Sequence, residues 1–183
     1  GTQFPLSKSY ISHPLYSELE SKIEQMYGIT PIITKNSTLG HLSVIPTLIR
    51  DEDAVIMDHQ VHWSVQNACQ LLKLRGIPVE MIRHSNLDML EDKIKQLTSK
   101  CNKIWYMADG VYSMFGDYAP IPELLALTQK YTQLNLYFDD VHGMSWKGKN
   151  GTGFIFEAIN ELPENCIVVS TLSKTFGASG ATL

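Results

Sequence analysis

Residues 166–180 read CIVVSTLSKTFGASG, where a short apolar run passes into a polar one. Ile167, Val168 and Val169 are β-branched and apolar, which predicts a buried strand. Lys174 therefore follows the end of that strand. We expect this lysine to be less solvated than a surface lysine, and desolvation favours the neutral amine that Schiff-base chemistry requires. The alternative is an ordinary loop lysine in a strand-to-loop connection.

Composition narrows the classes of function. The 183 residues are 44% hydrophobic, enough for one domain spanning 1–183. The net charge is −4 and Lys and Arg are scattered, which argues against a nucleic-acid partner. We expect no membrane helix and no export leader. Cys69, Cys101 and Cys166 are odd in number and lack C-x-x-C spacing, which argues against disulfides and zinc and favours the cytoplasm.

Apolar patterns for strands and helices alternate along the chain after an irregular segment at 1–12. The patterns predict strands at 29–34, 54–58, 78–82, 104–109, 134–140 and 167–169, and helices at 13–28, 42–49, 64–76, 87–100 and 122–131. This order predicts an α/β fold with three layers, α/β/α, around a mostly parallel sheet. Functional loops in such a fold gather at the carboxyl ends of the strands.

Polar clusters follow several of these strands. They include Ser37 with Thr38, His62, Ser113, the run from Asp139 to His142, and the run from Thr171 to Lys174. The turn before the second helix predicts an anion cradle, because a helix N-terminus supplies unpaired N–H groups; an ordinary strand-to-helix turn is the alternative.

Two further clusters have competing interpretations. His59 and His62 have a spacing that could suit a metal, but no third ligand has a matching pattern nearby, so we predict no metal site. Asp139 and Asp140 are adjacent carboxylates at a strand end. One of them could partner a cation, with His142 sharing the site; alternatively, one is buried in a hydrogen-bond network and the other is solvated.

Five segments together carry a family resemblance. They are HPLYSELE (13–20), VHWS (61–64), DGVYSMFGD (109–117), YFDDVHG (137–143) and STLSKTFG (170–177). In this order they resemble the fold type I pyridoxal-phosphate enzymes, and within these the α-oxoamine synthases. The matching family motifs are E-S-V-Y-S-M-D-G-D, D-E-x-H and T-x-S-K-A-F-G.

The resemblance implies a role for each matching residue. Lys174 would form the Schiff base with pyridoxal phosphate, and Asp139 would hold the proton on the pyridine nitrogen. The other implied contacts are His142 and Ser113 to the phenolic oxygen, His62 stacked on the ring, and Thr171 with the amides around Ser37 and Thr38 at the phosphate. Lys174, Asp139 and His142 would be the catalytic set.

The sequence also departs from the family pattern. Asp140 and Asp109 stand where the family has Glu, Phe115 where it has Asp, and Val61 where it has Asn. Family members are longer and add a small carboxy-terminal domain with an arginine for the substrate carboxylate. The resemblance therefore implies that 1–183 is the large domain without that addition.

The activity implied by the resemblance is condensation of an amino acid with an acyl thioester such as acyl-CoA, in a homodimer. An aminotransferase or a decarboxylase on the same fold is the alternative among enzymes. A non-catalytic cofactor-fold module is the alternative of a different class, because fold alone does not determine function.

Overall fold

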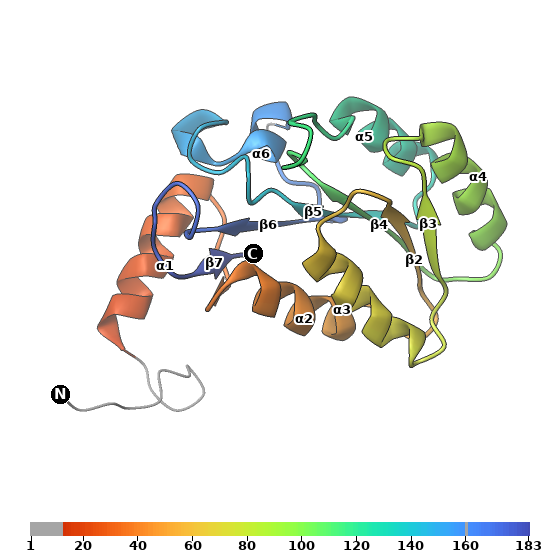
Figure 1. Cartoon of the computed structure of the whole chain (residues 1–183), viewed down its shortest axis with the longest axis horizontal. Coiled ribbons are helices and arrows are strands. Elements are labelled where there is room, and N and C mark those ends of the chain that lie inside the picture. Colours follow the sequence, from red (N-terminus) through yellow and green to blue (C-terminus); the bar gives the residue numbers. More distant parts are fainter. Residues whose placement is uncertain (1–12, 160) are drawn as a thin grey trace.

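The computed structural model describes residues 13–159 and 161–183, so the segment 1–12, expected to be irregular, lies outside the description. A seven-stranded sheet has the order β1-β7-β6-β5-β4-β2-β3 and forms the middle layer of the molecule (Figure 1). Strands β2 to β6 pair in parallel, and β7 is antiparallel to both of its neighbours. The α/β fold with a mostly parallel sheet is therefore confirmed.

The elements follow one another in a regular alternation. They are α1 (Pro14–Tyr27), β1 (Ile33–Thr34), α2 (Ser37–Leu48), β2 (Ala54–Asp58), α3 (Trp63–Lys73), β3 (Val79–Ile82), α4 (Leu87–Leu97), β4 (Ile104–Asp109), α5 (Ile121–Lys130), β5 (Leu134–Asp139), the 3₁₀ turn η1 (Lys149–Gly151), α6 (Phe154–Ala158), β6 (Cys166–Thr171) and β7 (Ala181–Thr182). Sequence patterns predict all of these except η1, α6 and β7.

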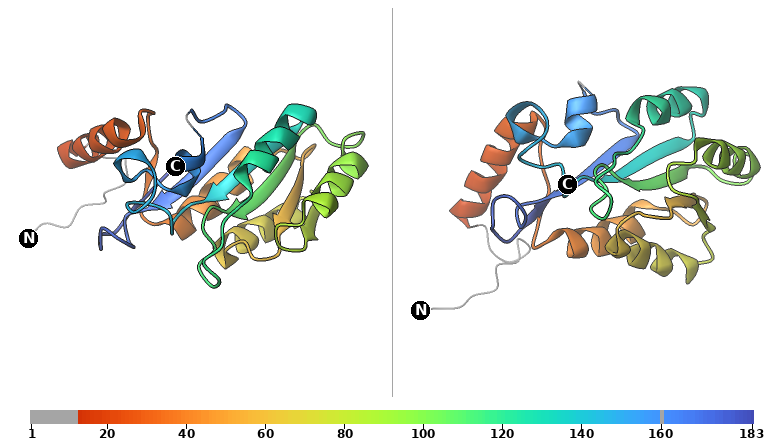
Figure 2. Two further views of the ribbon diagram at one scale, coloured as in Figure 1. Left: turned by 90° about the horizontal axis from the view of Figure 1, so that it is seen from above. Right: turned by 45° about the horizontal axis from the view of Figure 1, so that its top comes forward.

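Helices cover both faces of the sheet, as Figures 1 and 2 show. On one face α4, α5 and α6 pack against side chains such as Tyr106 and Phe138, and on the other α2 and α3 pack against Val55 and Met107. Successive strand residues point to opposite faces, so a strand buried on both faces is apolar at every position. This explains why β2 and β4 are continuous apolar runs until their final aspartates, and why β5 is apolar there except at Asn135.

Two helix ends follow from local chemistry. α1 ends where Gly28 adopts the left-handed conformation, with φ 75°, and its N–H donates to the carbonyl of Glu24 at 2.7 Å. α2 begins at the cap Asn36, whose side-chain oxygen accepts the N–H of Leu39 at 2.8 Å. α2 also contains Pro46 near its end and continues through it, as expected.

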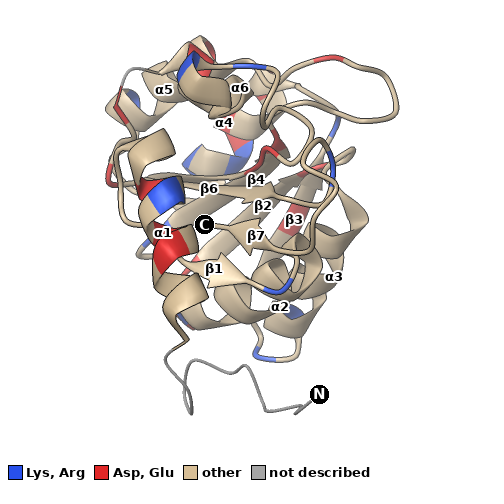
Figure 3. Ribbon diagram, turned by 90° about the vertical axis from the view of Figure 1, so that its left-hand side faces the viewer, with Lys and Arg blue, Asp and Glu red and all other residues tan. Residues whose placement is uncertain are grey.

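Charged residues of both signs share the surface helices, as α1 in Figure 3 illustrates. On that helix Lys22 pairs with Glu18 at 3.3 Å, four residues away. None of the helices in the described part of the chain is long and apolar enough to cross a membrane.

Candidate active site

A cleft of about 250 Å³ opens at the carboxyl ends of the parallel strands. Its walls come from α2, from the turns that follow β2 and β5, from the end of β4 and from the loop after β6. The lining residues are Asn36, Ser37, Thr38, His62, Trp63, Asp109, Asp139, Val141, His142, Ser173 and Lys174. Because β4, β5 and β6 are in parallel register, their last residues meet at this edge of the sheet.

Asp139 is the buried anion of the cleft. Its Oδ2 lies 3.0 Å from Nε2 of His41, and its Oδ1 accepts the N–H of Val141 at 3.2 Å. Burial raises the pKa of this carboxyl, but the hydrogen bond and charge of His41, together with the Val141 N–H, outweigh burial and hold the pKa below its usual value. Asp139 is therefore ionised at neutral pH.

His41 is a site residue that the sequence patterns did not single out. It is fully buried on α2, and its Nδ1 lies 2.8 Å from the hydroxyl of Tyr137 while its Nε2 lies beside Asp139. The sequence feature that could have identified it is helical spacing. His41 is four residues before the buried Ile45 and so lies on the inner face of the helix. A polar ring at a core position requires partners on the sheet.

Asp140 lies on the opposite side of the strand end, as alternation along a strand predicts. It is fully buried towards α6, where its Oδ2 accepts the N–H of Ile155 at 3.0 Å. Burial raises its pKa to about 7, with a smaller contribution from the charge of Asp139. The two adjacent aspartates thus have different environments, and Asp139 is the one that lines the cleft.

Asp109 is a second carboxyl in the cleft, in register with Asp139 on the neighbouring strand. Burial and the charge of Asp139 hold the pKa of Asp109 well above its usual range. It accepts the backbone N–H of His62 at 2.9 Å. We infer that Asp109 carries a proton while Asp139 does not, because two like charges this close disfavour double ionisation.

The two histidines that line the cleft are neutral. Burial lowers the pKa of His62 and of His142, and the charge of Lys174 lowers both further, against the opposing charge of Asp139. Nδ1 of His62 lies 2.6 Å from the hydroxyl of Ser64 and 4.0 Å from Oδ2 of Asp139. An uncharged ring suits stacking against a flat ligand.

Lys174 lies on the loop between β6 and β7 and lines the cleft. The loop is closed at its base, where the N–H of Leu172 donates to the carbonyl of Gly180 at 2.9 Å and the N–H of Ala178 donates to that of Leu172 at 2.9 Å. The expectation of a poorly solvated lysine is wrong for the described residues, because Lys174 is exposed. The loop projects beyond the sheet edge, where its neighbours do not cover it.

Ser37 and Thr38 begin α2 at the cleft. The carbonyl and side chain of Asn36 take the N–H groups of Gly40 and Leu39. The N–H groups of the first helical residues have no partner inside a helix, so those of Ser37 and Thr38 are available to an anion.

Two other predicted residues lie away from the cleft wall. Ser113 lines a separate hollow with Tyr112 and Phe115. Thr171 is buried at the end of β6, and its hydroxyl lies 2.9 Å from that of Ser173 and 3.1 Å from the carbonyl of Gly180.

Among the described residues, no group of three or more His, Cys, Asp or Glu side chains is arranged to hold a metal ion.

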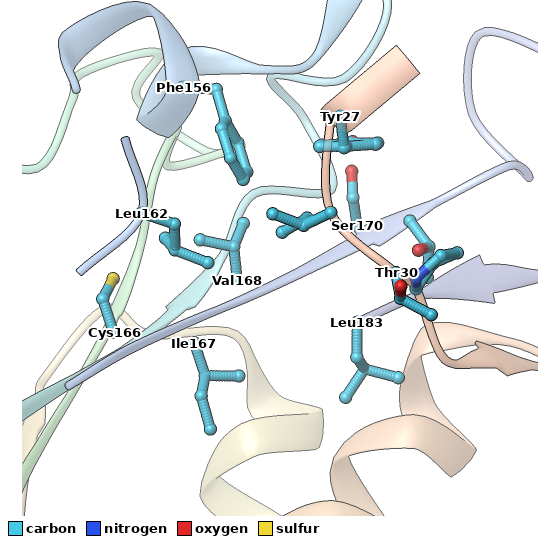
Figure 4. A pocket seen from close by; sticks show the side chains of 12 residues that line it. Tyr27, Thr30, Phe156, Leu162, Cys166, Ile167, Val168, Ser170 and Leu183 are labelled. Atoms are coloured by element: carbon cyan, nitrogen blue, oxygen red, sulfur yellow. The ribbon is translucent and has the colours of Figure 1, made fainter. Parts of the chain in front are cut away.

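A second hollow of about 160 Å³ lies between α1, α6 and β6 (Figure 4). Its walls are mostly apolar, with Tyr27, Phe156 and Val168 facing the same space. Burial raises the pKa of the Tyr27 phenol and of the Cys166 thiol to about 12, so neither supplies a nucleophile at neutral pH. The cleft around Asp139 is therefore the better candidate for chemistry.

Comparison with known proteins agrees with this geometry. The sequence profile of the family "Aminotransferase class I and II" matches residues 3–183. The chain belongs to this family. Within it, 8-amino-7-oxononanoate synthase from Petrotoga mobilis is 32% identical over 91% of the chain, and serine palmitoyltransferase from Sphingomonas paucimobilis is 31% identical over 90%.

Solved structures of the aminotransferase family give the same result. Serine palmitoyltransferase from Sphingomonas wittichii superposes with a TM-score of 0.82 at 28% identity, over 93% of this chain. A variant of the S. paucimobilis enzyme, solved with a bound PLP–myriocin aldimine, gives a TM-score of 0.81. 8-Amino-7-oxononanoate synthase and serine palmitoyltransferase are both α-oxoamine synthases, so the predicted resemblance is confirmed.

The chain spans about two fifths of the length of these relatives: 42% of the Petrotoga synthase, 38% of the Sphingomonas transferase and 42% of the S. wittichii structure.

Proposed function

We propose that residues 1–183 are the cofactor-binding large domain of a pyridoxal-phosphate-dependent α-oxoamine synthase, which condenses an amino acid with an acyl thioester such as acyl-CoA. The relatives named 8-amino-7-oxononanoate synthase and serine palmitoyltransferase support the reaction class. The observation that carries the proposal is one cleft that joins an accessible amine, Lys174, to a buried ionised carboxylate, Asp139.

The polar groups of the cleft fit the parts of pyridoxal phosphate. A phosphate suits the N–H groups of Ser37 and Thr38, and a protonated pyridine nitrogen suits Asp139. Lys174 would hold the aldehyde carbon, and neutral His62 would pack on the ring. His142 would contact the phenolic oxygen, and Thr171 would support the phosphate end. Ser113, the other residue expected at the phenolic oxygen, lines a separate hollow and not this cleft.

The cofactor supplies, when bound, an electron-accepting ring next to the amine of the substrate. Asp139 keeps the proton on the pyridine nitrogen, because an ionised carboxylate favours the protonated ring. His41 holds Asp139 in place and ionised. Lys174 would be the base that takes the α-proton of the amino acid.

A homodimer is part of the proposal. Lys174 is exposed, and so are large apolar side chains in the segments that follow β2, β4, β5 and β6. They include Trp63, Met114, Phe115, Trp146 and Phe176. Apolar groups in such numbers are typical of an interface, and a covering subunit would exclude water from Lys174. Cys69, Cys101 and Cys166 are unpaired, which supports a reducing, cytoplasmic location.

Borohydride reduction followed by peptide mass spectrometry tests the cofactor assignment. With pyridoxal phosphate present, the adduct should lie on Lys174 and disappear in Lys174→Ala. Lys147→Met is the matched control, since Lys147 pairs with Glu157 at 3.1 Å outside the cleft and should leave the adduct unchanged. An adduct on another lysine of the natural protein, or none, would refute the assignment.

The reaction type needs a second assay. Small amino acids are supplied to the natural protein with and without acyl-CoA, while free thiol and keto acid are measured. A synthase releases thiol only when both substrates are present. Stoichiometric keto acid, with no response to any thioester, would instead assign the protein to the aminotransferases.

A further inference from the structure

His84 lies between two carboxylates outside the cleft. Its Nδ1 is 3.0 Å from Oδ1 of Asp58, and its Nε2 is 2.6 Å from Oδ2 of Asp117. The three residues come from different parts of the fold: Asp58 ends β2, His84 follows β3, and Asp117 lies in the loop after β4. One imidazole ring therefore joins three segments that are distant in the sequence.

The hydrogen bonds that His84 can donate depend on its protonation state. An ionised carboxylate only accepts hydrogen bonds, and a neutral imidazole donates from one nitrogen alone. Both ring nitrogens of His84 face carboxylate oxygens at hydrogen-bond distance. Where both carboxylates are ionised, only the doubly protonated ring can donate to Asp58 and Asp117 together, so the geometry favours an imidazolium.

Asp58 is the fixed end of the arrangement. It is fully buried, and besides His84 it accepts the N–H of Gln60 at 2.8 Å, the N–H of Ser85 at 2.8 Å and the hydroxyl of Tyr106 at 3.2 Å. Ser85 adopts φ 49°, which is uncommon outside glycine, and in that conformation its N–H reaches Asp58. The backbone after β3 is thus shaped around this carboxylate.

Asp117 is the more exposed end, and it belongs to a loop over Gly110–Ala119. The loop is closed by the N–H of Tyr112 donating to the carbonyl of Asp117 at 2.9 Å and the N–H of Ala119 donating to that of Gly110 at 3.1 Å. At its tip Met114 is 85% exposed. The ring of His84 also meets the ring of Tyr112 edge-on, with centroids 4.4 Å apart.

We propose that His84, as an imidazolium between Asp58 and Asp117, is a positioning residue that fixes the Gly110–Ala119 loop against the end of β2. The loop begins directly after Asp109 and carries Ser113. The same Asp58 holds the turn that leads to His62 through the N–H of Gln60. His84 therefore sets the relative placement of the two segments that approach the cleft from β2 and β4.

The proposal has a defined pH dependence. Burial lowers the pKa of His84, but the hydrogen bonds and charges of Asp58 and Asp117 outweigh it and raise the pKa above the ordinary value. Asp58 and Asp117 are the carboxyl groups that face the ring, Tyr112 meets the ring edge-on, and the phenol of Tyr106 donates to the same Asp58. Both hydrogen bonds are present at pH values below the ordinary histidine pKa, and one of them is lost as pH rises through the raised pKa.

Limited chymotrypsin digestion of the protein without cofactor measures the loop directly. Phe115, 73% exposed at the loop tip, is the expected cleavage site. The cleavage rate is followed from about pH 5 to about pH 9 and divided by the rate on a free peptide at each pH. The variants are His84→Gln, which cannot be charged, and Asp117→Asn. Glu80→Gln is the matched control, because it removes a different ion pair, to Lys93 at 3.0 Å, from β3.

In the parent protein the normalised cleavage should rise about three- to tenfold across the titration of His84. His84→Gln and Asp117→Asn should cleave quickly and independently of pH, and combining them should add nothing further. Glu80→Gln should follow the parent profile. If His84→Gln does not fold, Asp117→Asn alone decides the question, since Asp117 is half-exposed.

A parent profile that is flat with pH, or an Asp117→Asn profile equal to that of the parent, would overturn the proposal. Because the digestion uses no cofactor and no substrate, its failure is distinguishable from failure of the proposed catalytic function.

Discussion

Asp140→Asn is expected to stabilise the protein at alkaline pH, although the side chain is fully buried and directly follows the proposed cofactor carboxylate. In the folded state Asp140 faces α6, where its Oδ2 accepts the N–H of Ile155. Its Oδ1 has no hydrogen-bond partner among the described residues. An asparagine keeps an acceptor for Ile155 and removes the charge, so the change isolates the electrostatic cost of burying a carboxylate.

The magnitude follows from the pKa of Asp140, which burial raises from 3.8 to about 7. Since each pKa unit corresponds to about 1.4 kcal/mol, ionising this group costs the folded state up to about 4 kcal/mol. Because the pKa of Asp140 is raised in the folded state, the group destabilises the protein only at pH values where it would otherwise be ionised. No cost exists below pH 3.8, the cost grows between 3.8 and about 7, and it is complete above that range.

Urea unfolding of parent and variant at about pH 5 and about pH 8 measures this difference. The free energy of unfolding of Asp140→Asn should exceed that of the parent at the higher pH, and the gap should narrow at the lower pH. A gap that does not change with pH, or a variant less stable than the parent at both values, would refute the reasoning. Circular dichroism would verify that both proteins start from the same fold.

Two further predictions concern neighbours of this residue. Asp139→Asn should lower the free energy of unfolding at neutral pH by about 1–3 kcal/mol, because His41 loses a charged partner. It should also abolish catalysis while Lys174 still captures the cofactor. Urea unfolding measures the first effect, thiol release and adduct mapping measure the second, and an active variant would contradict the assignment. Gly153→Ala should lower the free energy of unfolding by about 3 kcal/mol or more, since Gly153 has φ 108° and an added Cβ would lie 2.3 Å from Oδ2 of Asp140. Gly76→Ala is the control, because Gly76 has φ 79° and open space around it, and it should cost only about 1 kcal/mol. Equal losses of unfolding free energy in the two variants would contradict the steric explanation.

Most of the fold was predictable because strands and helices have strong local patterns. The β-branched run at Ile167 to Val169 and the helix stop at Gly28 required only neighbouring residues. α6 and β7 were missed for a physical reason. α6 has five residues, and β7 has two whose strand conformation depends on pairing with β1 and β6 rather than on their own propensity.

The site residues that follow the ends of strands were predictable from the sequence. The position of a site residue on a helix, and the solvation of one on a loop, were less so. The parallel sheet alone brings Asp139 and Lys174 to one edge. His41 lies in the middle of a helix, where its contact with Asp139 depends on how α2 packs on the sheet. The solvation of Lys174 depends on what covers a loop, and local sequence does not encode the groups that cover it.

The pairing of β1 with β7 constrains how the protein is made. Ile32 and Leu183 exchange two backbone hydrogen bonds, at 2.9 and 3.0 Å, so β1 pairs with a strand that lies about 150 residues further along the chain. At a synthesis rate of about 5–20 residues per second, β1 leaves the ribosome roughly 7 to 30 s before its partner strand exists. During that interval β1 has no partner strand, and this is when we expect the nascent chain to be most open to chaperones and to misassociation.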